Sequence, residues 1–237
     1  MISNGAISNG MKAVIPAAGG GIKMRPLTLE IPKPLLKIQG KAVIDYVFDA
    51  LPDEIDEAIV VVKYLAEKLK VYLGNSYKGR RIRYVEGSEK GNALGLLACR
   101  EFFKDGERFF ILHGDEPQRK IEIESCLRHQ YAWVCSEVSD PRMSGVATIG
   151  PDSRILEVIE KPENPKSNWS AMGTILADAD IFNYAPELNP NGEYHISSML
   201  NQFVKDHPVY MVRGINRPPL RSLADLEWDM KDFLGKA

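Results

Sequence analysis

Two kinds of segment alternate along the first half of the chain, and this alternation is the strongest restriction on the fold. Short runs typical of strands occupy residues 14–18, 58–62, 81–87 and 108–115. Segments with a helical spacing of apolar residues lie between them, at residues 44–51, 64–74 and 92–103. Strands that alternate with helices favour a parallel sheet covered on both faces, with ligands bound at the carboxyl ends of its strands.

The second half of the chain has a less regular pattern. Strand-type segments follow one another at 144–150, 154–162 and 170–178, which is consistent with an antiparallel section added to the sheet. We also predict helices at 179–184 and 193–205, a strand at 208–214 and a last helix at 222–234. No linker rich in glycine, proline or serine divides residues 11–237, so we predict one domain there, preceded by a flexible extension at residues 1–10.

Composition and charge exclude several classes of protein. The 237 residues are 44% hydrophobic and carry a formal net charge of −2, with acidic and basic residues interspersed. Such a chain fills a sizeable core but lacks the broad basic face that binds nucleic acid. It has no apolar stretch of membrane-spanning length and no signal-peptide pattern, so we expect a cytoplasmic protein without a membrane partner. Cys99, Cys126 and Cys135 lack C-x-x-C spacing and are expected to be reduced packing residues.

A glycine-rich loop follows the first strand. Gly19, Gly20 and Gly21 allow the backbone to approach a ligand closely, and their N–H groups can cradle an anion such as phosphate. The spacing matches neither G-x-x-x-x-G-K-[ST] nor G-x-G-x-x-G, and the prolines that follow keep the backbone extended. Cations along this loop would neutralise a polyphosphate, and they are Lys23, Arg25 and Lys33. The alternative is a surface turn with solvated charges.

The segment AAGGGIKMRPLTLEIPKPLLKIQGKAVIDYVFDAL, residues 17–51, resembles the signature of the sugar-1-phosphate nucleotidyltransferases, A-A-G-x-G-T-R-x-x-P-L-T followed by P-K-P-L. The resemblance covers residues 11–230 and weakens toward the end. It implies a Rossmann-like three-layer α/β sandwich with a mixed, mainly parallel central sheet. It also implies Mg²⁺-dependent attack of a sugar 1-phosphate on a nucleoside triphosphate, which gives a nucleotide sugar and pyrophosphate.

The resemblance assigns roles to residues along this loop. The nucleotide-binding residues that it implies here are Ala17, Ala18, Gly19, Gly20, Gly21 and Arg25. Lys33 matches the lysine of P-K-P, which meets the reacting phosphates, and it forms the implied catalytic group together with Lys23 and Asp115. The Thr-Arg pair of the family is replaced by Ile22-Lys23, which keeps a positive charge but loses the planar guanidinium fork.

Two residues are candidate metal ligands. Asp115 ends an apolar strand, where a carboxylate can bind Mg²⁺, and it matches the metal-binding aspartate of the family; a simple turn is the alternative. Near the carboxyl terminus, Pro219 occupies the place of the second aspartate of many relatives, and proline cannot bind metal. Another branch of the family uses the asparagine of a G-V-N turn. Gly214-Ile215-Asn216 follows the last strand in the same way and implies Asn216, with an ordinary turn asparagine as the alternative.

The segment EVIEKP carries a further mark of the family. The resemblance implies that Glu160 meets sugar hydroxyls, that Lys161 meets the sugar phosphate and that the backbone at Gly173 passes close to the sugar. Adjacent residues of a strand point to opposite faces, so we expect Glu160 and Lys161 not to pair with each other. Ordinary solvated charges are the alternative.

Among the predicted features, recognition of the nucleotide base has the weakest support in the sequence. Relatives often place a glutamine before G-T-A, whereas this chain has Glu86 near that point and Gly91-Asn92-Ala93 in place of G-T-A. We therefore count Glu86, Gly91 and Asn92 among the nucleotide-binding residues, and we expect Asn92 to open a helix. An ionised carboxylate only accepts hydrogen bonds, which would suit a base edge rich in N–H groups, such as that of guanine or cytosine.

Two alternative functions stand beside this interpretation. Departures from the family at Ile22, Lys23, Ser198 and Pro219 would suit a catalytically impaired regulatory homologue that binds a nucleotide sugar. The other alternative is a cytidylyltransferase that acts on a non-sugar phosphate such as phosphocholine. The sequence has no hexapeptide repeats, so we expect the acyltransferase domain of some relatives to be absent. An oligomer is compatible with the sequence, which does not indicate its size.

Overall fold

The computed structural model describes residues 10–189, 192–217, 220 and 222–234. The flexible extension predicted at residues 1–10 therefore lies outside the described residues, except for Gly10. Within the described part of the chain, no helix combines the length and the apolar character needed to cross a lipid bilayer.

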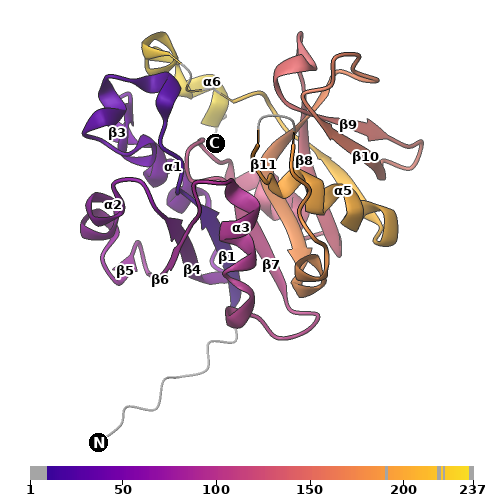
Figure 1. Ribbon diagram of the computed structural model, residues 1–237, viewed down its shortest axis with the longest axis horizontal. Coiled ribbons are helices and arrows are strands. Elements are labelled where there is room, and N and C mark those ends of the chain that lie inside the picture. The colour runs from indigo at the N-terminus through magenta and orange to yellow at the C-terminus, as the bar shows by residue number, and fades with distance from the viewer. Residues whose placement is uncertain (1–9, 190–191, 218–219, 221, 235–237) are drawn as a thin grey trace, which may run out of the picture.

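A mixed central sheet organises the molecule (Figure 1). Among the described residues it has ten strands, in the order β10-β9-β11-β7-β1-β4-β6-β5, and β8 joins both β11 and β12. The strands are β1 (Met11–Pro16), β4 (Ile55–Val62), β5 (Ser76–Tyr77), β6 (Arg80–Glu86), β7 (Arg108–Leu112), β8 (Tyr131–Glu137), β9 (Gly145–Ile149), β10 (Ile155–Glu160), β11 (Trp169–Asp178) and β12 (Val209–Arg213). β1 is parallel to both of its neighbours, β4 and β7, and β6 extends this parallel core. β9, β10 and β11 form the predicted antiparallel section.

Helices cover both faces of the sheet, which confirms the predicted three-layer sandwich (Figure 1). The helices are α1 (Val43–Ala50), α2 (Ala66–Leu73), α3 (Asn92–Leu97), α4 (Lys120–Cys126), α5 (Ile196–Asp206) and α6 (Met230–Leu234). Side chains of β1 alternate between the two outer layers. Ala13 and Ile15 belong to the apolar cluster with α1, α2 and α4, whereas Val14 belongs to the cluster with α3 and α5.

The last helix packs against the first third of the chain. Met230 and Phe233 of α6 share an apolar cluster with Ile38, Val43 and Tyr46. Ile38 belongs to a short hairpin formed by β2 (Lys37–Ile38) and β3 (Lys41–Ala42). Figure 1 shows α6 near β3, although the two segments lie far apart in the sequence.

The predicted helices differ from the observed ones at their ends, and the range 179–184 forms a 3₁₀ helix at Ala179–Asn183. α3 is predicted at 92–103, α5 at 193–205 and α6 at 222–234, and each of them begins or ends at a different residue. The last of these ranges divides into a 3₁₀ turn at Leu223–Glu227 and α6. The Asp229 carboxylate accepts the Lys231 N–H at 2.9 Å, so a new cap forms at the break and starts α6.

Helix α4 and strand β8 lie in ranges for which the sequence predicts no element. β8 lies between β11 and β12, and all of its residues except Glu137 are buried, so it lacks the alternation that marks a half-exposed strand. Both elements contribute buried cysteines, Cys126 and Cys135, and Cys99 is buried as well. Burial raises the pKa of the Cys99 and Cys126 thiols to about 12, so they stay protonated, in agreement with their predicted packing role.

We expect Phe109→Ala to destabilise the fold strongly. Phe109 is fully buried in β7, and its ring centroid lies 4.1 Å from that of Phe103 and 5.6 Å from that of Phe182. The substitution leaves a cavity, so the free energy of unfolding in urea should fall by about 3–5 kcal/mol. The control Val71→Ala changes a side chain that is 85% exposed and should alter it by less than about 0.5 kcal/mol. Equal effects would contradict this packing.

Candidate active site

A cleft with a volume of about 380 Å³ opens beyond the carboxyl end of β7. Its polar lining comes from the loops after β1, β7 and β8, from β11 and from the turn after β12. The residues that supply this lining include Lys33, His113, Asp115, Glu116, Gly173, Asn216 and Arg217. Open α/β sheets bind ligands at this edge. The structure thus brings four predicted site residues, Lys33, Asp115, Gly173 and Asn216, to one cavity.

Lys33 and Asp115 form an ion pair in the cleft. Lys33 Nζ lies 2.8 Å from Asp115 Oδ2, and 41% of the Asp115 side chain remains exposed. Partial burial acts to raise the pKa of the Asp115 carboxyl, but the Lys33 ammonium and the neighbouring His113 hold this pKa below the ordinary value of 3.8. Asp115 is therefore ionised at neutral pH and has the charge needed to bind a metal cation.

Asn216 supplies a second oxygen to the cleft. It follows β12, and its Oδ1 accepts the Arg217 N–H at 3.0 Å, which leaves one lone pair for a ligand. A carboxylate and an amide oxygen in one cleft are donors of the kind that Mg²⁺ prefers, so Asp115 and Asn216 fit such an ion. Pro219, the position of the second aspartate of many relatives, lies outside the described residues.

The glycine loop is held by hydrogen bonds to the rest of the protein. Gly21 has a φ of 57°, which glycine adopts without steric cost, and its carbonyl accepts the hydroxyl of fully buried Thr28 at 2.8 Å. The Tyr64 hydroxyl donates to the Thr28 carbonyl, also at 2.8 Å. Among the described residues, the N–H groups of Gly19, Gly20 and Gly21 have no hydrogen-bond partner. Free donors therefore lie where the sequence predicts phosphate binding.

The residues that flank these glycines differ in the polar groups that are available to bind a ligand. The Ala17 N–H donates to the Val61 carbonyl at 2.9 Å, so it continues the pairing of β1 and is not free. Ala18 is half-buried beside the loop. Lys23 and Arg25 are exposed, and within the described part of the chain neither side chain has a hydrogen-bonding or ionic partner. Both cations are therefore available to an incoming anion.

Gly173 lies where β11 passes the loop after β7. Its N–H donates to Glu116 Oε1 at 2.8 Å, and its carbonyl accepts the His113 N–H at 2.8 Å. A Cβ at this position would lie 2.4 Å from His113 Cγ, so a larger residue would displace that contact. The close approach at Gly173 is therefore to the loop after β7, and its contact with a sugar stays a prediction.

Glu160 and Lys161 form an ion pair, which contradicts the expectation from strand alternation. Lys161 Nζ lies 3.7 Å from Glu160 Oε1. β10 ends at Glu160, and Lys161 has a φ of 45°, so the alternation of strand side chains does not extend to Lys161. The Lys161 N–H donates to the carbonyl of Ser144, a residue that lines the cleft. The pair therefore lies next to the cleft without forming part of its lining.

The predicted base-binding residues do not line this cleft. Glu86 ends β6, and its Oε1 lies 2.6 Å from Lys63 Nζ in a separate hollow of about 360 Å³ beside α2. The hydrogen bond from Lys63, aided by its charge, holds the pKa of Glu86 below its ordinary value, so Glu86 is an ionised acceptor. α3 begins at Asn92, as expected, with Gly91 at the cap position before it, and Asn92 Oδ1 accepts the Ile196 N–H of α5 at 2.9 Å.

Two residues of the cleft, Glu116 and Arg217, are not among the predicted site residues. Glu116 lines the cleft, and its only local signal is that two carboxylates follow one strand. Arg217 has a side chain that is 1% exposed, and the hydrogen-bond partners of its guanidinium lie 43 to 100 residues away in the chain. Local patterns therefore carry no signal for Arg217.

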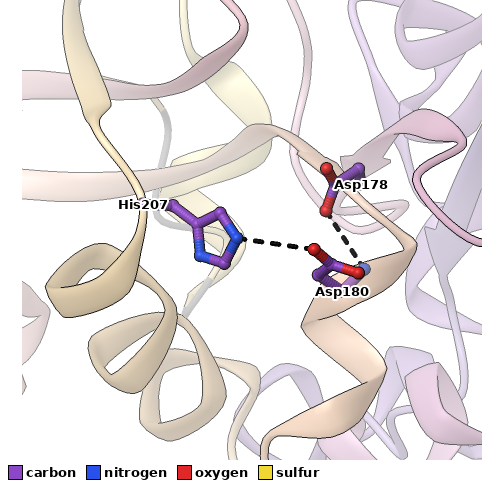
Figure 2. A group of neighbouring side chains, drawn as sticks. All are labelled: Asp178, Asp180 and His207. Carbon is purple, nitrogen blue, oxygen red and sulfur yellow. Dashed lines mark hydrogen bonds and ion pairs between the residues drawn. The ribbon is translucent and has the colours of Figure 1, made fainter.

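Three other side chains of types that can bind a metal ion lie together at the opposite end of the sheet. Ligand atoms of Asp178, Asp180 and His207 all lie within 4.8 Å of one another (Figure 2). Asp178 pairs with Arg108 at the start of β7, whereas the cleft lies beyond its end, so this group cannot act on a ligand in the cleft. Both Asp178 oxygens accept hydrogen bonds, from the Tyr131 hydroxyl at 2.6 Å and the Asp180 N–H at 3.0 Å. Asp178 thus caps the turn that follows β11, and this structural role accounts for the group.

Comparison with known proteins identifies the family. The model of the nucleotidyl transferase family matches residues 12–216, which include the glycine loop, Lys33, Asp115 and Asn216. The chain belongs to the nucleotidyl transferase family. Its relatives in this family include the UTP–glucose-1-phosphate uridylyltransferase AglF of Haloferax volcanii, 32% identical over 208 residues, which are 82% of this chain and 84% of that protein.

Longer proteins are also among the relatives. The bifunctional protein GlmU of Methanocaldococcus jannaschii is 31% identical over 202 residues, which are 84% of this chain and 48% of that protein. This member of the nucleotidyl transferase family thus spans about half the length of the GlmU proteins that it matches.

Solved structures confirm the Rossmann-like α/β fold. A Bacillus anthracis protein described as a glucose-1-phosphate thymidylyltransferase, in complex with a sucrose, matches with a TM-score of 0.79 and 25% identity over 92% of both chains. A UDP-glucose pyrophosphorylase complexed with UDP-glucose matches with a TM-score of 0.78 and 21% identity, over 92% of this chain and 96% of that one. The sheet described above is therefore the sheet of this family.

We expect Lys33→Met to raise the pKa of Asp115. The substitution leaves the burial that opposes ionisation and removes the ammonium that favours the ionised carboxyl, so the pKa should rise, although His113 still favours the ionised form. Because the native pKa is depressed, the pair stabilises the fold above about pH 4, and this contribution is lost as the pH falls through the folded-state pKa.

The carboxyl carbon shift of Asp115, followed by NMR across acidic pH, measures this change. Lys23→Met is the matched control, because it removes an exposed lysine that has no partner among the described residues. It should leave the titration of Asp115 unchanged. An unaltered titration in Lys33→Met would contradict the ion pair.

Proposed function

We propose that this protein transfers a nucleotidyl group from a nucleoside triphosphate to a sugar 1-phosphate and releases pyrophosphate. The observation that carries the proposal is the meeting of Lys33, Asp115 and Asn216 in one cleft, with a glycine loop after the neighbouring strand β1. Membership of the nucleotidyl transferase family supports it, because AglF and the Bacillus anthracis protein are named for reactions of this type.

In this proposal the glycine loop and its lysines bind the triphosphate. The N–H groups of Gly19 to Gly21 donate to phosphate oxygens, as successive backbone amides do in other anion sites. Lys33 leaves Asp115 for a phosphate oxygen when the substrate enters, and the exposed Lys23 balances charge on the departing pyrophosphate. A magnesium ion held by Asp115 and Asn216 would neutralise charge on the reacting phosphates.

The acceptor binds beside the triphosphate in the same proposal. Lys161 leaves Glu160 for the phosphate of the sugar 1-phosphate, and the freed Glu160 carboxylate accepts hydrogen bonds from sugar hydroxyls. An oxygen of the acceptor phosphate then attacks the α-phosphorus. The bond from the α-phosphorus to the bridging oxygen breaks, and the electron pair leaves with pyrophosphate.

Two observations favour different bases for the nucleotide. The names of AglF and of the Bacillus anthracis protein favour uracil or thymine, whereas an ionised Glu86 favours a base edge rich in N–H groups. UTP, dTTP, CTP, ATP and GTP should be tested against the 1-phosphates of glucose, galactose, mannose and N-acetylglucosamine, with pyrophosphate release as the readout. CTP with phosphocholine tests the non-sugar alternative.

A measurement of thermal stability with each nucleotide sugar completes this matrix. A ligand that binds only the folded state raises the unfolding temperature whether or not it is turned over. Thermal stabilisation without pyrophosphate release from any substrate pair would overturn the transferase and leave the binding-only homologue.

We expect Asp115→Asn to lower kcat by about 100-fold or more. The substitution removes a negative oxygen that is present where charge is redistributed in the transition state, and the loss of one such electrostatic partner has an effect of this order. Pyrophosphate release under saturating substrates measures it. Asp105→Asn is the matched control, because Asp105 lies in the loop before β7 with a side chain that is 91% exposed, and it should keep wild-type activity. Equal turnover of the two variants would remove Asp115 from the site.

We expect Lys33→Ala and Lys161→Ala to affect different substrates. Lys33 lines the cleft and is proposed to meet the triphosphate, so its loss should lower kcat and raise the KM for that substrate. Lys161 lies beside the cleft and is proposed to meet the acceptor, so its loss should mainly raise the KM for sugar 1-phosphate. Steady-state kinetics with each substrate varied in turn separates these effects. Identical changes in both variants would contradict this division.

A further inference from the structure

Arg217, which lines the cleft, and Glu122 form an almost completely buried ion pair. Their side chains are 1% and 2% exposed, and Arg217 Nη2 lies 2.6 Å from Glu122 Oε2. Desolvation offsets the attraction within such a pair, so its burial is weak evidence for a role in stability alone. Arg217 Nη1 has no hydrogen-bond partner among the described residues, which also argues against a purely stabilising role.

The guanidinium holds the segment that carries Asp115. Arg217 Nε donates to the Pro117 carbonyl at 2.9 Å, and Nη2 donates to Thr174 Oγ1 at 2.9 Å. Pro117 lies two residues after Asp115, and Thr174 of β11 pairs with Leu112 at the end of β7. One planar group thus joins the segment just after Asp115 to β11, the strand that pairs with the end of β7.

The same ion pair holds the turn that carries Asn216. Glu122 Oε1 accepts the Ile215 N–H at 3.0 Å, so helix α4 fixes the residue before Asn216. The residue after it is Arg217, whose N–H donates to Asn216 Oδ1 at 3.0 Å. Asn216 therefore lies between two residues that the buried pair holds in place.

We propose that Arg217 is a positioning residue that sets the separation between Asp115 and Asn216. A guanidinium has donors in a fixed planar arrangement, so it can join the two segments in one geometry that a lysine cannot reproduce. Groups that orient metal ligands typically change metal affinity by about 10- to 100-fold. The inference rests on the proposed function, because it takes Asp115 and Asn216 as the ligands of the metal.

Mn²⁺ binding to the substrate-free protein, followed by electron paramagnetic resonance, tests the proposal. The first variant combines Arg217→Met with Glu122→Gln, which removes both charges of the buried pair together. Their further partners, Arg119 and Glu116, keep 17% and 20% of their side chains exposed to solvent. The thermal unfolding midpoint of this variant should stay close to that of the wild type, while its dissociation constant for Mn²⁺ should rise about 10-fold or more. Arg217→Lys keeps the charge but loses the fork, and it should weaken Mn²⁺ binding to a similar extent.

Two controls separate positioning from general destabilisation. Glu57→Gln weakens another buried contact, because Glu57 is 2% exposed and lies 3.0 Å from Arg81 toward the amino end of β4, away from the cleft. This variant should lower the unfolding midpoint and leave Mn²⁺ affinity unchanged. Asp115→Asn should abolish Mn²⁺ binding.

The outcomes distinguish the two hypotheses. Wild-type Mn²⁺ affinity in Arg217→Lys and in the folded double variant, together with loss of binding in Asp115→Asn, would overturn the positioning role and leave the proposed function intact. Absence of Mn²⁺ binding by the wild type, or full binding by Asp115→Asn, would overturn the metal site of the substrate-free protein and the positioning role with it. Pyrophosphate release by the wild type tests the proposed function separately.

Discussion

The parallel pairing of β1 with β4 and β7 is the constraint on which the rest of the structure depends. Parallel neighbours need crossover connections, and these connections place helices on both faces and bury the strands completely. The pairing also makes the chain leave β1 and β7 at the same edge of the sheet. The Gly114 N–H donates to the Pro16 carbonyl at 2.9 Å, one residue before Asp115. Backbone pairing alone therefore brings the glycine loop close to the carboxylate.

The free protein keeps two of its proposed substrate-binding cations paired with carboxylates. Lys33 lies on Asp115 and Lys161 on Glu160, with N–O distances of 2.8 and 3.7 Å. Partly exposed pairs of this kind are worth little energy, so a ligand can separate them easily. A phosphate group carries more negative charge than one carboxylate and attracts a lysine more strongly. The pairs thus favour exchange with phosphorylated ligands over capture of weaker anions.

Sequence patterns predicted the parts of the site that depend on neighbouring residues in the chain. The glycine loop and Asp115 could be found because each directly follows an apolar strand. The contact of Lys161 with Glu160 could not be predicted in this way. Strand alternation assumes that the strand continues, but the backbone leaves the strand at Lys161. Asn92 resembles a cap for its own helix, yet its oxygen reaches α5, whose position depends on the tertiary fold.

The same distinction explains the missing parts of the fold and of the cleft. β8 is buried by strands on both sides, so its sequence shows no half-exposed pattern. The contacts of Arg217 join three segments that become neighbours only after β11, α4 and the turn beyond β12 have packed together. Such residues are recognised from three-dimensional contacts, because their spacing in the sequence follows no local rule.

The contact between α6 and the β2–β3 hairpin has a consequence for the order in which the protein forms on the ribosome. Ile38 and Val43 follow Lys33 closely in the chain, but Met230 and Phe233 complete their apolar cluster. Synthesis delivers Ile38 and Val43 before α6, so these side chains lack their final covering until α6 has emerged. The segment next to Lys33 is therefore made well before the helix that completes its packing.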